Sequence, residues 1–282
     1  MNSLKIICPN NKRLLKGLSG YRLAVRVKDP AQAVEAAALV RDSGNDLVRV
    51  IVDSEKPFDQ LTFLEDQKPL PLAVITPSMG RFRHLAKGLN LLREMNLCLY
   101  LPCGSPENST ALKILSSLGV KGCALIGRGP TDWEALTDLM TYALLERVPH
   151  AAIEPFAFIA AHYDPLSTLN WKEVYFDDPA QFLHMDSKGR IALTAAELGQ
   201  RRFIARSIDE IGGAADVPAI RERLQEWRGY FVKNHPCASC NGWKVCLGTF
   251  SPPPPKENGC AGFFREMIEV IRQYRAQKAG GE

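Results

Sequence analysis

The sequence predicts an α/β fold, in which a partial or complete βα barrel over residues 1–155 precedes a smaller cysteine-rich domain over residues 156–282. Three observations carry this prediction. Short apolar runs recur with a period of 25 residues in the first half, and segments with helical spacing lie between them. Four of the eight cysteines fall within the 24 residues that end at Cys260. An open, doubly wound sheet is the alternative for the first half.

The five apolar runs have the composition of buried strands. They are RLAVRV from Arg22, LVRVIV from Leu47, LAVITP from Leu72, LCLYLP from Leu97 and GCALIG from Gly122. Each is rich in Val, Ile and Leu with little polar alternation, which is typical of parallel strands covered on both faces. A sixth strand is predicted around Ala151–Phe158.

The segments between the runs predict helices. They are DPAQAVEAAALVRDSG, SPENSTALKILSSLG and GPTDWEALTDLMTYALLER. In the first, Asp29 is a candidate N-cap, Pro30 fits the first helical position and Gly44 is a stop signal. Strands that alternate with helices through right-handed crossovers become parallel neighbours, so the pattern indicates successive βα units.

The second half has a different pattern. FLHMDSKGRIAL predicts a hairpin that turns at residues 187–189, and ADVPAIRERLQEWRGYFVKN predicts one helix that leads into the cysteines. The prolines of SPPPPK, residues 251–256, predict an extended spacer. A last helix is predicted over GFFREMIEVIRQYRAQK.

Composition excludes several function classes. The net charge of +4 is too small to indicate a nucleic-acid partner, and no glycine-rich nucleotide-binding loop is present. The N-terminus has no continuous apolar stretch and no run of 18 apolar residues occurs, so we expect a soluble, cytosolic protein. In a reducing compartment, clustered cysteines are more often metal or cluster ligands than disulfides.

The clustered cysteines have the spacing C-x2-C-x5-C-x13-C, formed by Cys237, Cys240, Cys246 and Cys260. Four thiolates suit a tetrahedral zinc ion or an iron–sulfur cluster, and spacing alone does not choose between them. Four incidental free thiols are the remaining alternative. Of the other four cysteines, the sequence predicts Cys8, Cys98 and Cys123 to be small buried apolar side chains.

Polar residues come after each predicted strand, where βα folds gather their sites. They are Lys28 and Asp29, then Asp53 and Glu55, then Thr76, Ser78 and Arg81, then Cys103 and Ser105, then Arg128. An enzyme hypothesis would use Asp53, Glu55, Arg81 or Cys103 on a small substrate. The alternative is that these are solvated loop residues.

The local sequence of the cysteines supplies a resemblance. CASCNGWKVC, followed by Cys260, resembles the C-terminal SPASM domain of radical SAM peptide-modifying enzymes, and HMDSKGRIALT and LGQRRFIARSIDEI are similar to stretches upstream of it. The resemblance spans Phe182 to Gly262. It implies one 4Fe-4S cluster on Cys237, Cys240, Cys246 and Cys260. It also implies a degenerate partial βα barrel of the radical SAM type, followed by a SPASM-like domain with hairpin, cysteine loop and C-terminal helix.

The departures from that family narrow the expected function. KDPAQAVEAA stands after the first predicted strand where radical SAM enzymes have C-x3-C-x2-C, and DSEKP stands where they have Gly-Gly-Glu. Thr194 and Phe250 occupy positions of cysteines that hold the family's first auxiliary cluster. These departures imply no independent radical SAM activity and no catalytic residues.

The remaining pattern resembles the SPASM-domain proteins of GeoRSP peptide-maturation systems. That resemblance implies a non-catalytic accessory protein whose partners are a radical SAM/SPASM enzyme, a precursor peptide or a PqqD-like protein. We expect it to bind neither nucleic acid nor a membrane. A zinc-stabilised interaction domain and a barrel enzyme are the alternatives.

Overall fold

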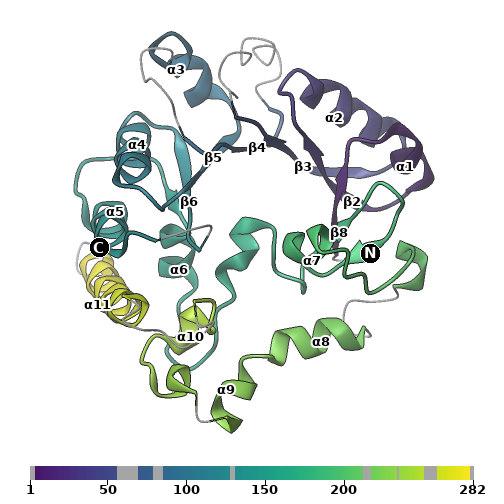
Figure 1. Cartoon of the computed structure of the whole chain (residues 1–282). Helices are drawn as coiled ribbons and strands as arrows, with labels where there is room; N and C mark the ends of the chain where they lie inside the picture. The colour runs from purple at the N-terminus through teal and green to yellow at the C-terminus, as the bar shows by residue number, and fades with distance from the viewer. Residues whose placement is uncertain are drawn as a thin grey trace. The chain divides into compact units, whose positions relative to one another are not determined.

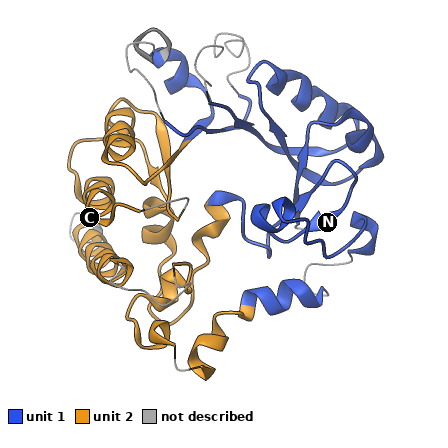
Figure 2. Ribbon diagram, viewed as in Figure 1, with its two compact units in different colours: residues 1–99, 175–224 blue, residues 100–174, 225–282 orange. Residues whose placement is uncertain are grey.

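The computed structural model describes residues 4–55, 69–78, 85–127, 131–211, 217–233, 235–250 and 259–279. The chain forms two compact units, each built from two separate stretches (Figure 2). Unit 1 comprises residues 1–99 and 175–224, and unit 2 comprises residues 100–174 and 225–282. The predicted domain boundary after residue 155 lies inside unit 2, and it stays a prediction.

Unit 1 contains a parallel sheet with one antiparallel edge strand (Figure 1). Its strands are β1 (Lys5–Pro9), β2 (Arg22–Val27), β3 (Asp46–Asp53), β4 (Leu72–Ile75), β8 (Phe182–Met185) and β9 (Ile191–Ala192). They lie in the order β4-β3-β2-β1-β8-β9. Strands β1 to β4 keep chain order without the reversal that a doubly wound sheet requires, which favours the barrel-type alternative.

Three helices of unit 1 follow its successive parallel strands. They are α1 (Lys12–Gly17), α2 (Gln32–Asp42) and α3 (Leu85–Glu94). In α2, Ala33, Ala36, Ala37 and Val40 are buried, so the helix lies close to β2 and β3. The predicted start of this helix was too early, because Asp29 accepts a hydrogen bond from the Ala31 backbone and the helix begins at Gln32.

The predicted hairpin is present between β8 and β9. Gly189 has φ +86°, a left-handed conformation that favours glycine. Asp186 holds the turn: its Oδ1 accepts hydrogen bonds from the Lys188 and Arg190 backbone N–H groups, both at 2.9 Å, and its Oδ2 accepts from the Arg190 guanidinium at 2.8 and 2.6 Å. After the hairpin come α7 (Ala195–Gly199), η4 (Ile208–Glu210) and α8 (Pro218–Gln225).

Unit 2 continues the alternation of strands and helices. Strand β5 (Leu97–Pro102) crosses from the sequence range of unit 1 into that of unit 2. After it come α4 (Pro106–Ser117), β6 (Lys121–Leu125), α5 (Trp133–Leu145), β7 (Ile153–Glu154), α6 (Phe156–His162) and η3 (Trp171–Tyr175). Ser105 and Asp132 cap α4 and α5 as side-chain acceptors, and β6 pairs in parallel with β7.

The C-terminal part of unit 2 is helical. It contains α9 (Arg228–Val232), η6 (Pro236–Ser239), α10 (Trp243–Cys246) and α11 (Cys260–Ala279). Among the described residues, no helix is long and apolar enough to cross a membrane. The predicted SPPPPK spacer lies outside the described residues.

Two predicted elements need correction. The sixth strand is only the two residues of β7, because the segment after Pro155 forms helix α6. The single helix predicted over ADVPAIRERLQEWRGYFVKN is two helices, α8 and α9, interrupted at Glu226 and Trp227.

Candidate functional site

The four clustered cysteines lie on or beside three helical elements of unit 2. Cys237 is in η6, Cys240 ends it, Cys246 is the last residue of α10 and Cys260 is the first residue of α11. Backbone hydrogen bonds from Cys240 N to Cys237 O (3.3 Å) and from Trp243 N to Cys240 O (3.1 Å) form consecutive tight turns. The C-x2-C spacing thus corresponds to one turn of chain, as the sequence indicates.

Gly242 brings this cysteine loop against α11. A Cβ atom at position 242 would clash with the Cβ of Phe264, so the close approach requires glycine. Phe264 lies four residues after Cys260 and therefore one helical turn along the same face. The contact holds the loop that carries Cys240 and Cys246 against the first turns of the helix that begins with Cys260.

A second segment of unit 2 anchors α10. The indole Nε1 of Trp171 donates a hydrogen bond to the Val245 carbonyl oxygen at 2.7 Å, and the Leu169 backbone N–H donates to the Lys244 carbonyl oxygen at 3.0 Å. The Lys244 ammonium group also donates to the Pro165 carbonyl oxygen. Residues 165–171 therefore fix α10 through three contacts distant in sequence.

The thiols of this region influence one another electrostatically. Burial raises the pKa of Cys246 to about 12, and the charge of Cys260 adds to the rise. Burial is also the main cause of the raised pKa of Cys260, followed by the charges of Cys240 and Cys237.

The donor set fits a metal or cluster in its chemistry, since four thiolates are the ligands of zinc and of iron–sulfur clusters. The described residues contain no group of three or more His, Cys, Asp or Glu side chains that could hold a metal ion as placed. The elements that carry the four cysteines are held near one another, and binding would require their side chains to close onto a common centre.

The other four cysteines lie far from the cysteine loop in sequence. Cys8, Cys103 and Cys123 are buried, as predicted for Cys8 and Cys123, while Cys98 is half-buried rather than buried. Burial raises the pKa of both Cys8 and Cys103 to about 12. A thiol in that state is protonated at neutral pH, so Cys103 does not have the properties of a nucleophile.

The polar residues at the strand ends have local roles or are exposed. Asp53 ends β3 and is exposed, as are Lys28 and Glu55. Thr76 is buried and donates a hydrogen bond to the Ser78 carbonyl oxygen at 3.0 Å. Arg81 and Arg128 lie outside the described residues. The structure therefore gives the enzyme hypothesis no assembled catalytic group among these described side chains.

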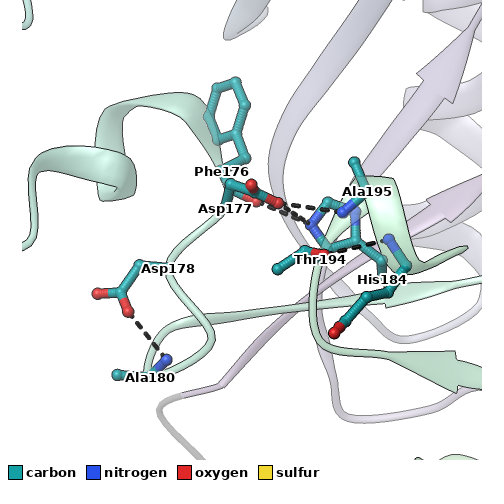
Figure 3. Close-up of polar contacts among 8 residues, drawn as sticks. Phe176, Asp177, Asp178, Ala180, His184, Thr194 and Ala195 are labelled. Carbon is teal, nitrogen blue, oxygen red and sulfur yellow. Dashed lines mark hydrogen bonds and ion pairs between the residues drawn. The ribbon is translucent and has the colours of Figure 1, made fainter. Parts of the chain in front are cut away.

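Thr194, which stands where the resembling family has a cysteine, is a helix cap in unit 1 (Figure 3). Its Oγ1 accepts a hydrogen bond from the Glu197 backbone N–H at 3.2 Å, at the start of α7. Asp177 Oδ1 accepts from the adjacent Ala195 N–H at 3.0 Å and lies 3.3 Å from His184 Nε2. This polar group, centred on a buried histidine of β8, was not predicted from the sequence.

Phe250, the second such position, is an aromatic packing residue of unit 2. The centroid of its ring lies 5.3 Å from that of the Trp133 ring, in an edge contact, and 5.8 Å from that of the Phe264 ring. A Cβ atom on Gly127 would lie 2.9 Å from the Phe250 ring, so the ring also covers the end of the β6 segment. Both substituted positions thus have structural functions of their own.

Comparison with solved structures gives a similarity at low sequence identity. No protein-family model and no curated protein matches the chain. A crystal structure of Streptococcus suis SuiB bound to S-adenosylmethionine aligns with a TM-score of 0.49 and 13% sequence identity, covering 87% of this chain and 72% of that chain. At this TM-score the similarity carries no argument about the fold or activity of this chain.

Proposed function

We propose that this chain is a non-catalytic iron–sulfur accessory protein, which binds one 4Fe-4S cluster through Cys237, Cys240, Cys246 and Cys260. It would assist a radical SAM/SPASM peptide-modifying enzyme. Its barrel would be a degenerate form of the radical SAM type, and the cysteine region would be a SPASM-like domain.

The observation that carries this proposal is the contact between Gly242 and Phe264. It joins the loop between Cys240 and Cys246 to the helix that Cys260 begins, so residues separated by the 251–258 segment become neighbours. The CASCNGWKVC spacing supports the choice of a cluster, because it resembles the SPASM ligand pattern. When bound, such a cluster can carry electrons or cross-link the chain.

The turn after the second strand of unit 1 supports the accessory role. This turn carries Lys28, Asp29 and Pro30, and none of these side chains is a thiol that could ligate a catalytic cluster. Thr194 and Phe250 serve as a helix cap and a packing residue. The proposed partners are therefore the proteins that would perform and receive the chemistry: a radical SAM/SPASM enzyme, a precursor peptide or a PqqD-like protein.

The decisive experiment is anaerobic purification with a visible absorption spectrum and with iron, sulfide and zinc analysis. We expect brown protein with about four irons and four sulfides per chain, the composition of one 4Fe-4S cluster. Colourless protein that contains zinc would reject the iron–sulfur proposal and support a zinc-stabilised interaction domain. Protein that binds neither would reject both.

Matched cysteine variants test the ligand assignment. Cys240→Ala should lose the cluster together with the local order of the C-terminal region, because a metal centre and its surroundings fold together. Cys98→Ala should keep both, since Cys98 lies on β5, away from the cysteine loop in sequence. Equal iron content in the two variants would contradict the assignment. Turnover of a small substrate by the isolated protein would favour the barrel enzyme instead.

A further inference from the structure

A surface of unit 2 beside the cysteine loop carries aromatic and apolar side chains that the fold does not bury. We define the Trp227 surface by six residues. They are Trp227, Arg228, Phe231, Val232, Lys233 and Trp243. None of the five residues of α9 is buried, and Val232 and Phe231 are 85% and 42% exposed. Large apolar groups gathered in this way on a surface mark interaction sites.

Three aromatic rings organise the centre of this surface. Trp227 and Trp243 have ring centroids 5.2 Å apart, and the Phe231 ring lies 5.0 Å from Trp243 and 6.0 Å from Trp227 in edge contacts. Trp227 and Phe231 are four residues apart, so they share one face of the helical segment. The rings form one continuous aromatic group.

The Tyr230 side chain anchors α9 and thereby holds the Trp227 surface in position. The Tyr230 ring lies so close to Gly248 that a Cβ atom at position 248 would clash with the ring. The centroids of the Tyr230 and His235 rings are 4.9 Å apart. Gly248 has φ +71°, which favours glycine for a second reason. Because Tyr230 fixes α9 against the segment after α10, Phe231 and Val232 are presented outward from an ordered element.

Two exposed cations belong to this surface, Arg228 and Lys233. Arg228 lies over the Trp227 ring with its guanidinium carbon 5.6 Å from the centroid, and its one hydrogen bond in the described part of the chain is to the neutral Gln225 side chain. Lys233 is exposed, and within the described ranges no ion pair joins either cation to a carboxylate. The surface thus presents two cations beside its apolar groups, with a single carboxylate, Glu226, next to Trp227 in sequence.

We propose that the Trp227 surface is a docking site for an acidic polypeptide segment that also carries apolar side chains. Aromatic anchors with a charged rim are the usual composition of a protein-binding surface, in which the rim selects the partner by charge. None of the six residues is a candidate cluster ligand, so the proposal does not depend on which metal centre the cysteines hold.

An anionic membrane is the competing occupant, and the structure favours a polypeptide. The two tryptophans are packed against each other and half-buried, which leaves Phe231 and Val232 as the exposed apolar groups of a five-residue helix. Interfacial membrane helices instead present a long apolar face. The aromatic rings are therefore better suited to contact one or two apolar side chains of a polypeptide than to insert into a bilayer.

The test uses the full-length protein and a fluorescein-labelled synthetic peptide of glutamate and leucine, with fluorescence anisotropy as the readout. We expect binding that weakens with added salt, while a matched lysine–leucine peptide does not bind. The double substitution Arg228→Glu with Lys233→Glu should weaken binding about tenfold or more, which corresponds to about 1.4 kcal/mol. Val232→Ser should also weaken it.

Matched substitutions elsewhere are the controls. Arg272→Glu on α11 and Val148→Ser, whose side chain is 63% exposed, should leave peptide binding unchanged. Circular dichroism would verify that all variants fold. Equal binding of the two peptides, no binding of the acidic peptide, or binding unaffected by both surface variants would overturn the proposal. So would variant-sensitive binding to phosphatidylserine vesicles without binding to the peptide.

Discussion

The Trp171 indole donates its hydrogen bond to the carbonyl oxygen of Val245 at 2.7 Å, in a buried position that joins residues 74 apart in sequence. Val245 precedes Cys246, so the bond fixes the end of α10 that carries a candidate ligand. The cysteine loop is therefore positioned by an aromatic side chain from outside the cysteine cluster.

Trp171→Phe should keep most of the ring volume and remove the donor. A buried carbonyl oxygen left without its partner costs about 1–3 kcal/mol, so we expect a loss of that size in the free energy of unfolding. Urea unfolding measures it. Trp227→Phe is the control, because the indole of Trp227 is half-buried and should contribute less. A loss no larger in Trp171→Phe than in the control would show that the bond does not anchor α10.

Gly242→Ala should destabilise the C-terminal region. The new methyl group would clash with Phe264, and forced overpacking of this kind costs about 1–3 kcal/mol. Gly262→Ala provides the control on α11, since no atom lies within 4 Å of its added Cβ and alanine favours the helix by up to about 1 kcal/mol. Thermal unfolding should move the two melting temperatures in opposite directions. A shift of the same sign in both would argue against the Gly242–Phe264 contact.

Asp186→Asn should weaken the β8–β9 hairpin in a pH-dependent way. Burial acts to raise the pKa of Asp186, but the hydrogen bonds from Arg190 and Lys188 outweigh it and leave the pKa below its usual value. A carboxylate with a lowered folded-state pKa stabilises the protein above its unfolded pKa of about 3.9, and this stability is lost as pH falls through the lower, folded value.

The expected loss for Asp186→Asn at neutral pH is about 1–3 kcal/mol, and the difference from the unmodified protein should shrink in acid. Urea unfolding over a series of pH values measures both effects. Asp46→Asn is the matched control, because its ion pair with Arg22 is exposed and contributes at most about 1 kcal/mol. A difference for Asp186→Asn that stays constant from neutral pH into acid would contradict the charge-based account.

Thr194→Ala should cost about 1 kcal/mol, because α7 loses the side-chain acceptor for the Glu197 N–H group. Thr194→Ser retains the hydroxyl and should restore most of the stability. Chemical denaturation compares the three proteins. If serine and alanine were equally destabilising, the threonine would contribute through its methyl group rather than as a cap.

The strand positions could be predicted because their signal is local. Runs such as LVRVIV and LCLYLP are predominantly apolar, and the structure places β3 and β5 on them. Strand β1 was missed because KIICP ends in proline and lies outside the 25-residue period. Its stability comes from pairing on both sides, with Ile7 opposite Ala24 and His184, and that pairing is not encoded in the run itself.

The sequence predicted which residues form the candidate site, but not how the fold brings them together. Spacing grouped Cys237, Cys240, Cys246 and Cys260, but it did not show how Cys260 is brought to the other three. That depends on the close contact of Gly242 with Phe264. The contact between His184 and Asp177 has no periodic signal either, because Asp177 lies on irregular chain before β8. Tertiary contacts decide such positions.

The place of β1 between β2 and β8 sets an order of events during synthesis. Lys5 leaves the ribosome well before its partner Phe182 on β8, which emerges only after the whole of α4, β6, α5 and α6 has been made. At 5–20 residues per second that delay is roughly 10–35 s, during which one edge of β1 has no strand beside it. In the nascent chain, one edge of β1 therefore stays unpaired until β8 has been translated.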